Sequence, residues 1–266
     1  FIQITRQWYL VEVGDNPEQE FDTTTYSLQA TQTLIAPESW YSYGAASAAT
    51  ASAETARRIL ATLAAQPCAV LGLATGGTMK PVYEALRTAL GQSPATFTSF
   101  NLDEYVGLPS THPQSYAYYM KTHLFDAVAL PGAQTHLPRG DAPDPAAEAT
   151  RYEAAIAAAG GIDLQLLGLG ANGHIGFNEP TSSLASRTRI KTLTHKTVTD
   201  NARYFGSDEV VPRLAITMGI GTILDSRAIL LLATGAGKRD AVARMIEGSI
   251  SAACPATALQ LHANVT

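Results

Sequence analysis

The sequence is poor in cysteine, in long apolar runs and in net charge, and each shortage disfavours a class of protein. Its 266 residues include two cysteines, Cys68 and Cys254, without the paired spacing of zinc or redox motifs. No stretch approaches the ~18 apolar residues of a membrane span, and the first residues show no secretory signal. The net charge of −5 comes without a basic stripe for nucleic acid. We therefore expect a cytoplasmic protein that binds neither membrane nor nucleic acid.

Several common catalytic motifs are also missing. The segment Gly168–Gly173 matches the spacing Gly-x-Gly-x-x-Gly, but His174–Pro180 follows it where a dinucleotide-binding turn should open a helix. There is no Walker A loop, no Gly-x-Ser-x-Gly elbow and no His-Glu-x-x-His, and the six histidines are dispersed. We expect neither a metal nor an organic cofactor.

Acidic residues are concentrated at the start of the chain. Residues 1–30 hold five acids and one base, so this segment carries −4 of the net charge of −5. We interpret it as an N-terminal appendage of unknown role, with a strand at Trp8–Val13 and no DNA-binding helix-turn-helix or basic region. Residues 31–266 then form the main domain.

In this domain, short β-rich apolar runs alternate with helical patterns, which is typical of βαβ units. The pattern predicts a single α/β domain with a doubly wound, mainly parallel, Rossmann-like sheet and helices on both faces. The predicted strands are Leu34–Ala36, Ala69–Ala74, Phe97–Asn101, Leu164–Leu169 and Ala228–Ala233. The predicted helices cover 46–65, 81–91, 114–125, 144–159 and 236–247.

Ligands of such sheets bind at the carboxyl ends of the strands, so the loops that follow strands are candidate sites. After the strand at 69–74, Thr75, Gly76, Gly77 and Thr78 lead directly into a helix. Backbone N–H groups beside a helix N-terminus suit an anion such as phosphate. The alternative is a glycine turn that serves only to reverse the chain.

Two further loops carry titratable side chains. His174 and Glu179 share a glycine-rich loop with two asparagines, and histidine is the side chain best suited to move a proton near neutral pH. Asp103 and Glu104 follow the strand at 97–101 and offer a base for removing a proton beside a carbonyl. Taken singly, this histidine could be structural and these acids could face solvent; together with the glycine loop they indicate a site.

The three loops together resemble the glucosamine-6-phosphate deaminase family. The resemblance rests on Thr75–Thr78, Asp103–Leu108 and Gly173–Pro180 and extends from about residue 31 to the end of the chain. It implies conversion of glucosamine 6-phosphate to fructose 6-phosphate and ammonia without a cofactor. The enzyme would be a hydrolase that acts on a C–N bond through aldose–ketose isomerase chemistry. The alternatives are a 6-phosphogluconolactonase-like enzyme and a non-enzymatic sugar-phosphate sensing domain.

The resemblance also implies a role for individual residues. His174, assisted by Glu179 and Asn172, would open the sugar ring, and Asp103 would move a proton from C2 to C1. The phosphate would be held by Gly76, Gly77, Thr78, Arg203 and Lys238. Some family members are hexamers activated by N-acetylglucosamine 6-phosphate, so we expect a homo-oligomer. The residues that match that regulatory site are Ser182, Arg189, Lys191 and Thr192.

Asn172 and Met79 mark departures from the family pattern. Asn172 stands where some family members have Asp, and Met79 follows Thr78 where proline is expected. The first bears on how His174 is oriented and charged. The second bears on the shape of the phosphate loop.

Overall fold

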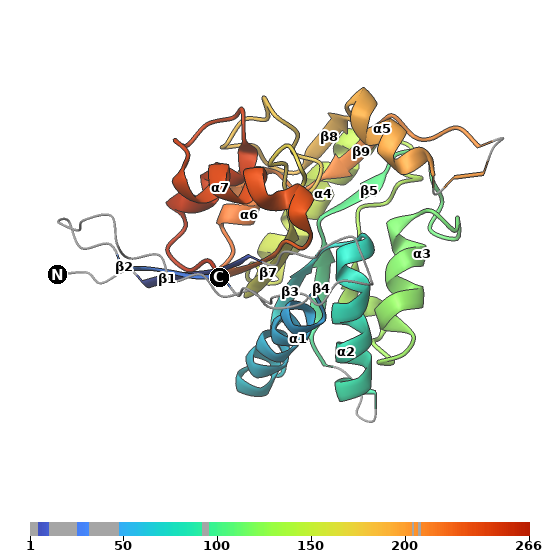
Figure 1. The fold of residues 1–266 in the computed structure, drawn as a ribbon. Coiled ribbons are helices and arrows are strands. Elements are labelled where there is room, and N and C mark those ends of the chain that lie inside the picture. The colour runs from blue at the N-terminus through green and yellow to red at the C-terminus, as the bar shows by residue number, and fades with distance from the viewer. Residues whose placement is uncertain (1–4, 11–25, 32–47, 92–95, 204, 207–208) are drawn as a thin grey trace, which may run out of the picture.

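The computed structural model describes residues 5–10, 26–31, 48–91, 96–203, 205–206 and 209–266 (Figure 1). Near the N-terminus, β1 (Thr5–Leu10) pairs antiparallel with β2 (Tyr26–Thr31), so the predicted strand Trp8–Val13 overlaps β1 at residues 8–10. The predicted strand Leu34–Ala36 lies outside the described residues. The division between 1–30 and 31–266 stays a prediction.

A five-stranded parallel sheet forms the centre of the described fold. Its strands, in the order β10-β7-β3-β4-β6, are Ala228–Leu232, Leu164–Gly168, Val70–Leu73, Thr98–Asn101 and Thr135–His136. Nearly all residues of β10, β7 and β3 are buried, which is the pattern of strands covered on both faces. The predicted mainly parallel sheet is confirmed.

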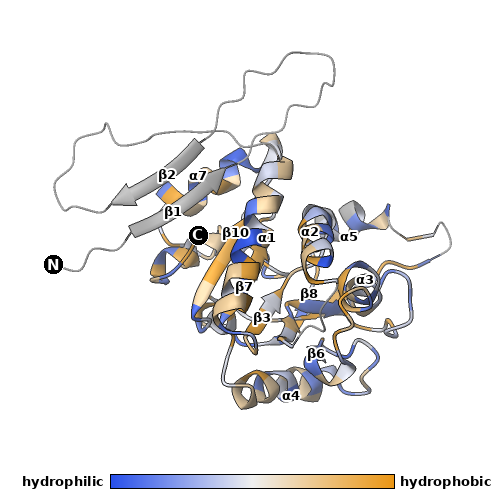
Figure 2. Ribbon diagram, turned by 90° about the horizontal axis from the view of Figure 1, so that it is seen from below, coloured by the Kyte–Doolittle hydropathy of each residue, from blue (hydrophilic) through white to orange (hydrophobic). Residues whose placement is uncertain are grey.

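Helices cover both faces of this sheet: Figure 2 shows α1 and α2 on one side of the strands and α4 on the other. The helices are α1 (Ala48–Ala65), α2 (Lys80–Leu90), α3 (Tyr116–Met120), α4 (Pro145–Ala158), α5 (His195–Ala202), α6 (Ile220–Leu224) and α7 (Arg239–Glu247). The predicted helix at 114–125 is α3 followed by one π-helical turn, Lys121–Phe125. Within the described part of the chain, no helix is long and apolar enough to span a membrane.

A separate antiparallel sheet, which the sequence patterns did not indicate, stands beside the parallel one. It consists of β5 (Asp103–Tyr105), β9 (Leu214–Thr217) and β8 (Arg189–Thr192), in that order. These strands of three or four residues are too short to show a clear alternation. Because β5 begins two residues after β4 ends, the chain crosses between the sheets at Leu102.

The strand order changes direction at the pair β3 and β7. From β3 the chain proceeds to β4 and β6 on one side, and it then returns to place β7 and β10 on the other side. In open α/β sheets the crevice at such a switch point is where ligands bind. The loops after β3 and β7 are two of the three that the sequence singled out.

Candidate active site

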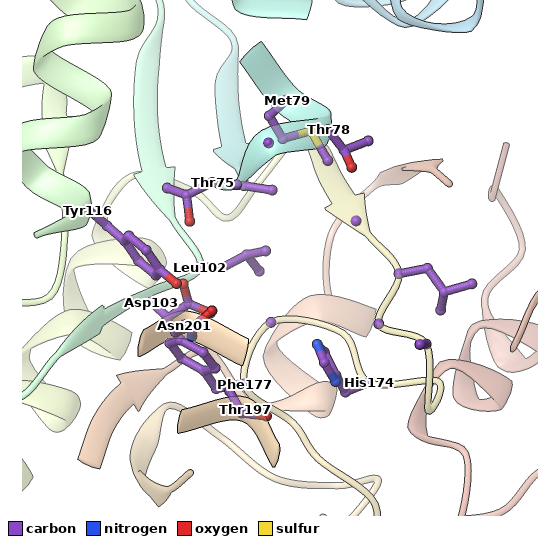
Figure 3. Close-up of a pocket in the computed structure, with 18 of the residues that line it drawn as sticks. Thr75, Thr78, Met79, Leu102, Asp103, Tyr116, His174, Phe177, Thr197 and Asn201 are labelled. Carbon is purple, nitrogen blue, oxygen red and sulfur yellow. The ribbon is translucent and has the colours of Figure 1, made fainter. Parts of the chain in front are cut away.

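A cavity of about 290 Å³ lies at this switch point (Figure 3). Its walls come from the loops after β3, β4 and β7, from α5 and from the turn before α7. The lining residues include Thr75, Gly76, Gly77, Thr78, Met79, Leu102, Asp103, Tyr116, Asn172, His174, Phe177, Thr197, Asn201 and Lys238. The three candidate loops therefore meet in space as the sequence predicted.

One wall of the cavity is a glycine turn. Gly76 has φ 107° and ψ 171°, a conformation that is open only to glycine. The short 3₁₀ turn Gly77–Met79 follows and leads into α2, so the N-terminal end of that helix faces the cavity. Met79, which stands where the resemblance leads us to expect proline, is the buried last residue of this turn and lies close to Gly168 at the end of β7. Unpaired N–H groups at such an end favour an anionic ligand.

The same turn recurs after β10. Ala233, Thr234 and Gly235 repeat the Ala-Thr-Gly sequence that follows β3, Gly235 also has positive φ, and a 3₁₀ turn leads into α7. Lys238 ends this second turn and lines the cavity. The two turns flank the loop after β7, because β3 and β10 lie on either side of β7, and the second turn brings another helix N-terminus and a cation to the same cavity.

The acidic pair Asp103 and Glu104 is divided between two environments, because successive residues of a strand point to opposite sides. Asp103 lines the cavity, and burial, reinforced by Glu104, raises its pKa to about 8 despite hydrogen bonds with Phe177 and Thr217. Glu104 turns away and accepts backbone N–H groups of Tyr116 and Ala117 at the start of α3, at 3.0 and 2.9 Å. Burial raises its pKa to about 7. Asp103 is therefore the candidate base and Glu104 holds α3.

The loop after β7 approaches Asp103 closely at Gly176. Gly176 has φ 54°, and a side chain there would place its Cβ 3.2 Å from Oδ2 of Asp103. In the same loop, a Cβ on Gly170 would lie 2.3 Å from the His174 ring. No helix begins in residues 169–188, so the Gly-x-Gly-x-x-Gly spacing serves close packing and not dinucleotide binding.

His174 is held by a hydrogen-bonded chain. Its Nδ1 lies 2.7 Å from Oδ1 of Asn172, which also accepts the backbone N–H of His174 at 3.1 Å. Nδ2 of Asn172 donates to Oε2 of Glu179 at 2.6 Å. These partners fix the Asn172 amide with its oxygen toward the ring, so neutral His174 carries its proton on Nδ1. Nε2 keeps its lone pair and is the atom able to accept a proton.

Glu179 is the buried end of this chain, only 1% exposed, and it does not line the cavity. Burial opposes its ionisation, but the nearby His174 and the hydrogen bonds from Thr197 and Asn172 outweigh burial and lower its pKa to about 2. Its Oε2 lies 3.5 Å from Nδ1 of His174. Glu179 is thus a fixed negative charge that lies behind the imidazole and outside the cavity.

Comparison with known proteins identifies the family. The profile described as "Glucosamine-6-phosphate isomerases/6-phosphogluconolactonase" matches residues 43–266. The chain belongs to this family. It is 58% identical over 210 residues to glucosamine-6-phosphate deaminase of Shewanella loihica, covering 78% of each chain. It is 58% identical over 200 residues to the deaminase of Cellvibrio japonicus, covering 74% of this chain and 76% of the relative.

Solved structures agree with the fold. One, described as a monomeric glucosamine-6-phosphate deaminase, shares 46% identity with a TM-score of 0.80 and covers 83% of this chain and 92% of its own. The 6-phosphogluconolactonase of Trypanosoma brucei has a TM-score of 0.63 at 22% identity, covering 83% of this chain and 92% of its own. At that identity the likeness concerns the fold alone.

The family resemblance assigned several residues that the cavity does not contain. Arg203, a predicted phosphate ligand, is exposed at the end of α5 and is not among the lining residues. The four residues matched to the regulatory site lie outside the cavity as well. Ser182 is buried; Arg189, Lys191 and Thr192 lie on β8, the edge strand of the antiparallel sheet. Arg189 donates to Oδ1 of Asn178 at 2.9 Å.

Sequence reasoning missed three cavity residues that come from helices. Tyr116 lies at the start of α3, and Thr197 and Asn201 lie one turn apart on α5. None of them follows a predicted strand, and α5 itself was not predicted. The available signal was Thr194, whose side chain accepts the N–H of Thr197 as an N-cap. Among the described residues no three His, Cys, Asp or Glu side chains are grouped to hold a metal.

Proposed function

We propose that this chain converts glucosamine 6-phosphate to fructose 6-phosphate and ammonia. The observation that carries the proposal is the pairing of Asp103 and His174 in one cavity whose other end is the glycine turn, as Figure 3 shows. Deaminases at 52–58% identity support this reaction over lactone hydrolysis, because the lactonase structures share only the fold. No observation favours a non-enzymatic sensing role.

His174 would act first, on the closed sugar ring. The unprotonated Nε2 accepts the proton of the anomeric hydroxyl, and the imidazolium then delivers a proton to the ring oxygen as the ring opens. The anionic Glu179, linked through Asn172, stabilises the imidazolium during this step. Asn172 keeps the ring orientation, and it does so as an amide where some family members have Asp.

Asp103 would act second, on the open-chain aldehyde. Its carboxylate removes the proton from C2, which gives an enolamine, and the same carboxyl returns the proton to C1. The product is an imine at C2; water adds to it, and ammonia leaves to give the ketone, which is the hydrolytic part of the reaction. A pKa raised to about 8 suits a group that must both take and give a proton near neutral pH.

The phosphate would be bound opposite these groups. Gly76, Gly77 and Thr78 offer backbone N–H groups at the start of α2, and Lys238 adds a positive charge. Arg203 remains a prediction as a further phosphate ligand. The homo-oligomer and the N-acetylglucosamine 6-phosphate site also stay predictions, and the relative solved at 46% identity is described as monomeric.

Ammonia release from glucosamine 6-phosphate tests this proposal. We expect turnover by the intact chain and at least about a hundredfold loss in Asp103→Asn, which keeps the shape but removes the base. Glu148→Gln is the matched control, because Glu148 is also a buried carboxylate but does not line the cavity. Absence of ammonia with wild-type protein, or hydrolysis of 6-phosphogluconolactone in its place, would overturn the proposal.

A further inference from the structure

Helix α5 is hydrogen-bonded to both β5, which carries Asp103, and the loop after β7, which carries Glu179. Nδ2 of Asn201 donates to the hydroxyl of Tyr105 at 2.8 Å, on the strand that carries Asp103. One turn earlier, the hydroxyl of Thr197 donates to Oε1 of Glu179. Both α5 residues line the cavity, and Thr197 is itself buried. The helix is therefore bonded directly to the carboxylate that supports His174.

The charge on Glu179 fixes the direction of every hydrogen bond around it. An ionised carboxylate can only accept, so Thr197 must donate its single hydroxyl proton to Oε1. Thr197 and Thr194 also have their hydroxyl oxygens 3.0 Å apart, and Thr194 must be the donor there, because the Thr197 proton is already used. On the other side, Asn172 donates to Oε2. Hydrogen bonds thus run toward Glu179 from both sides.

We propose that Thr197 is a positioning residue for this reaction: its hydroxyl, oriented by Thr194, fixes the Glu179 carboxylate so that Asn172 and His174 keep their catalytic orientation. The inference rests on the proposed function for its activity measurements. It adds α5 to the catalytic network, which family resemblance had limited to His174, Glu179, Asn172 and Asp103.

The effect of removing the hydroxyl follows from burial. Without Thr197 the oxygen Oε1 would be a buried anionic acceptor that has lost this partner, which costs more than losing a hydrogen bond at the surface. The carboxylate would rotate or gain a proton, and Asn172 could then turn its amide. His174 would populate both ring tautomers, and only the one with its proton on Nδ1 can accept a proton at Nε2.

Three variants separate this role from simple packing. Thr197→Val keeps the shape and removes the hydroxyl, Thr197→Ser keeps the hydroxyl, and Thr199→Val is the control, because Thr199 is exposed on the same helix. We expect Thr197→Val to lower kcat about tenfold to a hundredfold, as for one hydrogen bond to a charged group, with KM within about twofold. Thr197→Ser and Thr199→Val should stay within about twofold of wild type in kcat.

The ¹⁵N signals of the His174 ring provide a second readout that needs no activity, with His174→Gln to assign them. Wild type should show a protonated Nδ1 and a bare Nε2, and Thr197→Val should show mixed tautomers. If wild type releases no ammonia, the proposed function fails and these spectra still decide the role of Thr197. If Thr197→Val does not fold, Thr197→Ala takes its place.

Three results would overturn the inference. The first is a kcat of Thr197→Val within twofold of wild type. The second is an equal loss in Thr197→Ser and Thr197→Val, which would make packing the cause. The third is an unchanged His174 tautomer in the variant that lacks the hydroxyl.

Discussion

Asp103 and Glu179 are two buried carboxyl groups beside one cavity, and their pKa values move in opposite directions. Asp103 is 6% exposed and Glu179 is 1% exposed, so burial alone would raise both. Burial dominates at Asp103, whose pKa is about 8, with the nearby charge of Glu104 acting in the same direction. At Glu179 the nearby His174 and the hydrogen bonds from Thr197 and Asn172 prevail, and its pKa is about 2. The partners therefore decide the role: one carboxyl exchanges protons and the other keeps its charge.

Among the changes that test these two roles, we expect Glu179→Gln to have the largest effect on activity. A glutamine amide would place an NH₂ group against a donor, either Asn172 or Thr197, and would remove the charge that stabilises protonated His174. We expect kcat/KM for glucosamine 6-phosphate to fall by about a hundredfold, within the range of a lost acid–base contribution. Steady-state ammonia release measures it, with Glu148→Gln as the control. A fall below threefold would contradict the assigned role of Glu179.

A pH titration tests the difference in pKa between Asp103 and Glu179, with an expected effect smaller than that of Glu179→Gln. Asp103 must be ionised to act as a base, so kcat/KM should rise by up to about tenfold per pH unit as the pH approaches about 8. The carboxyl ¹³C signal of Asp103, identified by its absence in Asp103→Asn, should titrate near the same pH. The Glu179 signal should not move above about pH 4. An Asp103 carboxyl that titrates below pH 5 would refute the contrast.

The smallest expected effect is on stability: Asp103→Asn should raise the Tm and Glu179→Gln should lower it. Folded Asp103 keeps its proton up to about pH 8 whereas the unfolded chain loses it near 3.8, so Asp103 lowers stability as the pH rises through that range. Asp103→Asn should raise the Tm at pH 9 by at least about 2 °C, the equivalent of roughly 1 kcal/mol for this chain length.

Glu179 behaves in the opposite way, because its folded pKa is depressed. Its stabilising contribution is present above the ordinary value of 4.5 and is lost as the pH falls to about 2. Glu179→Gln should therefore lower the Tm at pH 7 by at least about 2 °C. Calorimetry of both variants under matched buffers measures the pair of shifts. Tm shifts of the same sign for the two variants at pH 9 would contradict the opposite pKa shifts of Asp103 and Glu179.

The positions of the site loops were predictable because strand and helix patterns are local. The predicted strands at 69–74, 97–101, 164–169 and 228–233 agree with β3, β4, β7 and β10 to within one residue at each end. Parallel strands bring their carboxyl ends to one edge, so the loops that follow them had to lie near one another. The antiparallel sheet was not predictable from its short strands, and α5, which supplies Thr197 and Asn201, was missed with it.

The sequence by itself determined that Asp103, His174 and the glycine loop would lie near one another, since the order of apolar runs and glycine turns places all three after strands of one sheet. Only the tertiary structure decided what each group does. It directs Asp103 into the cavity and Glu104 away from it. It also places Glu179 behind Asn172, outside the cavity, and brings Thr197 of α5 to Glu179. The physical reason is that desolvation and hydrogen bonding depend on neighbours in space, which residues distant in the chain supply.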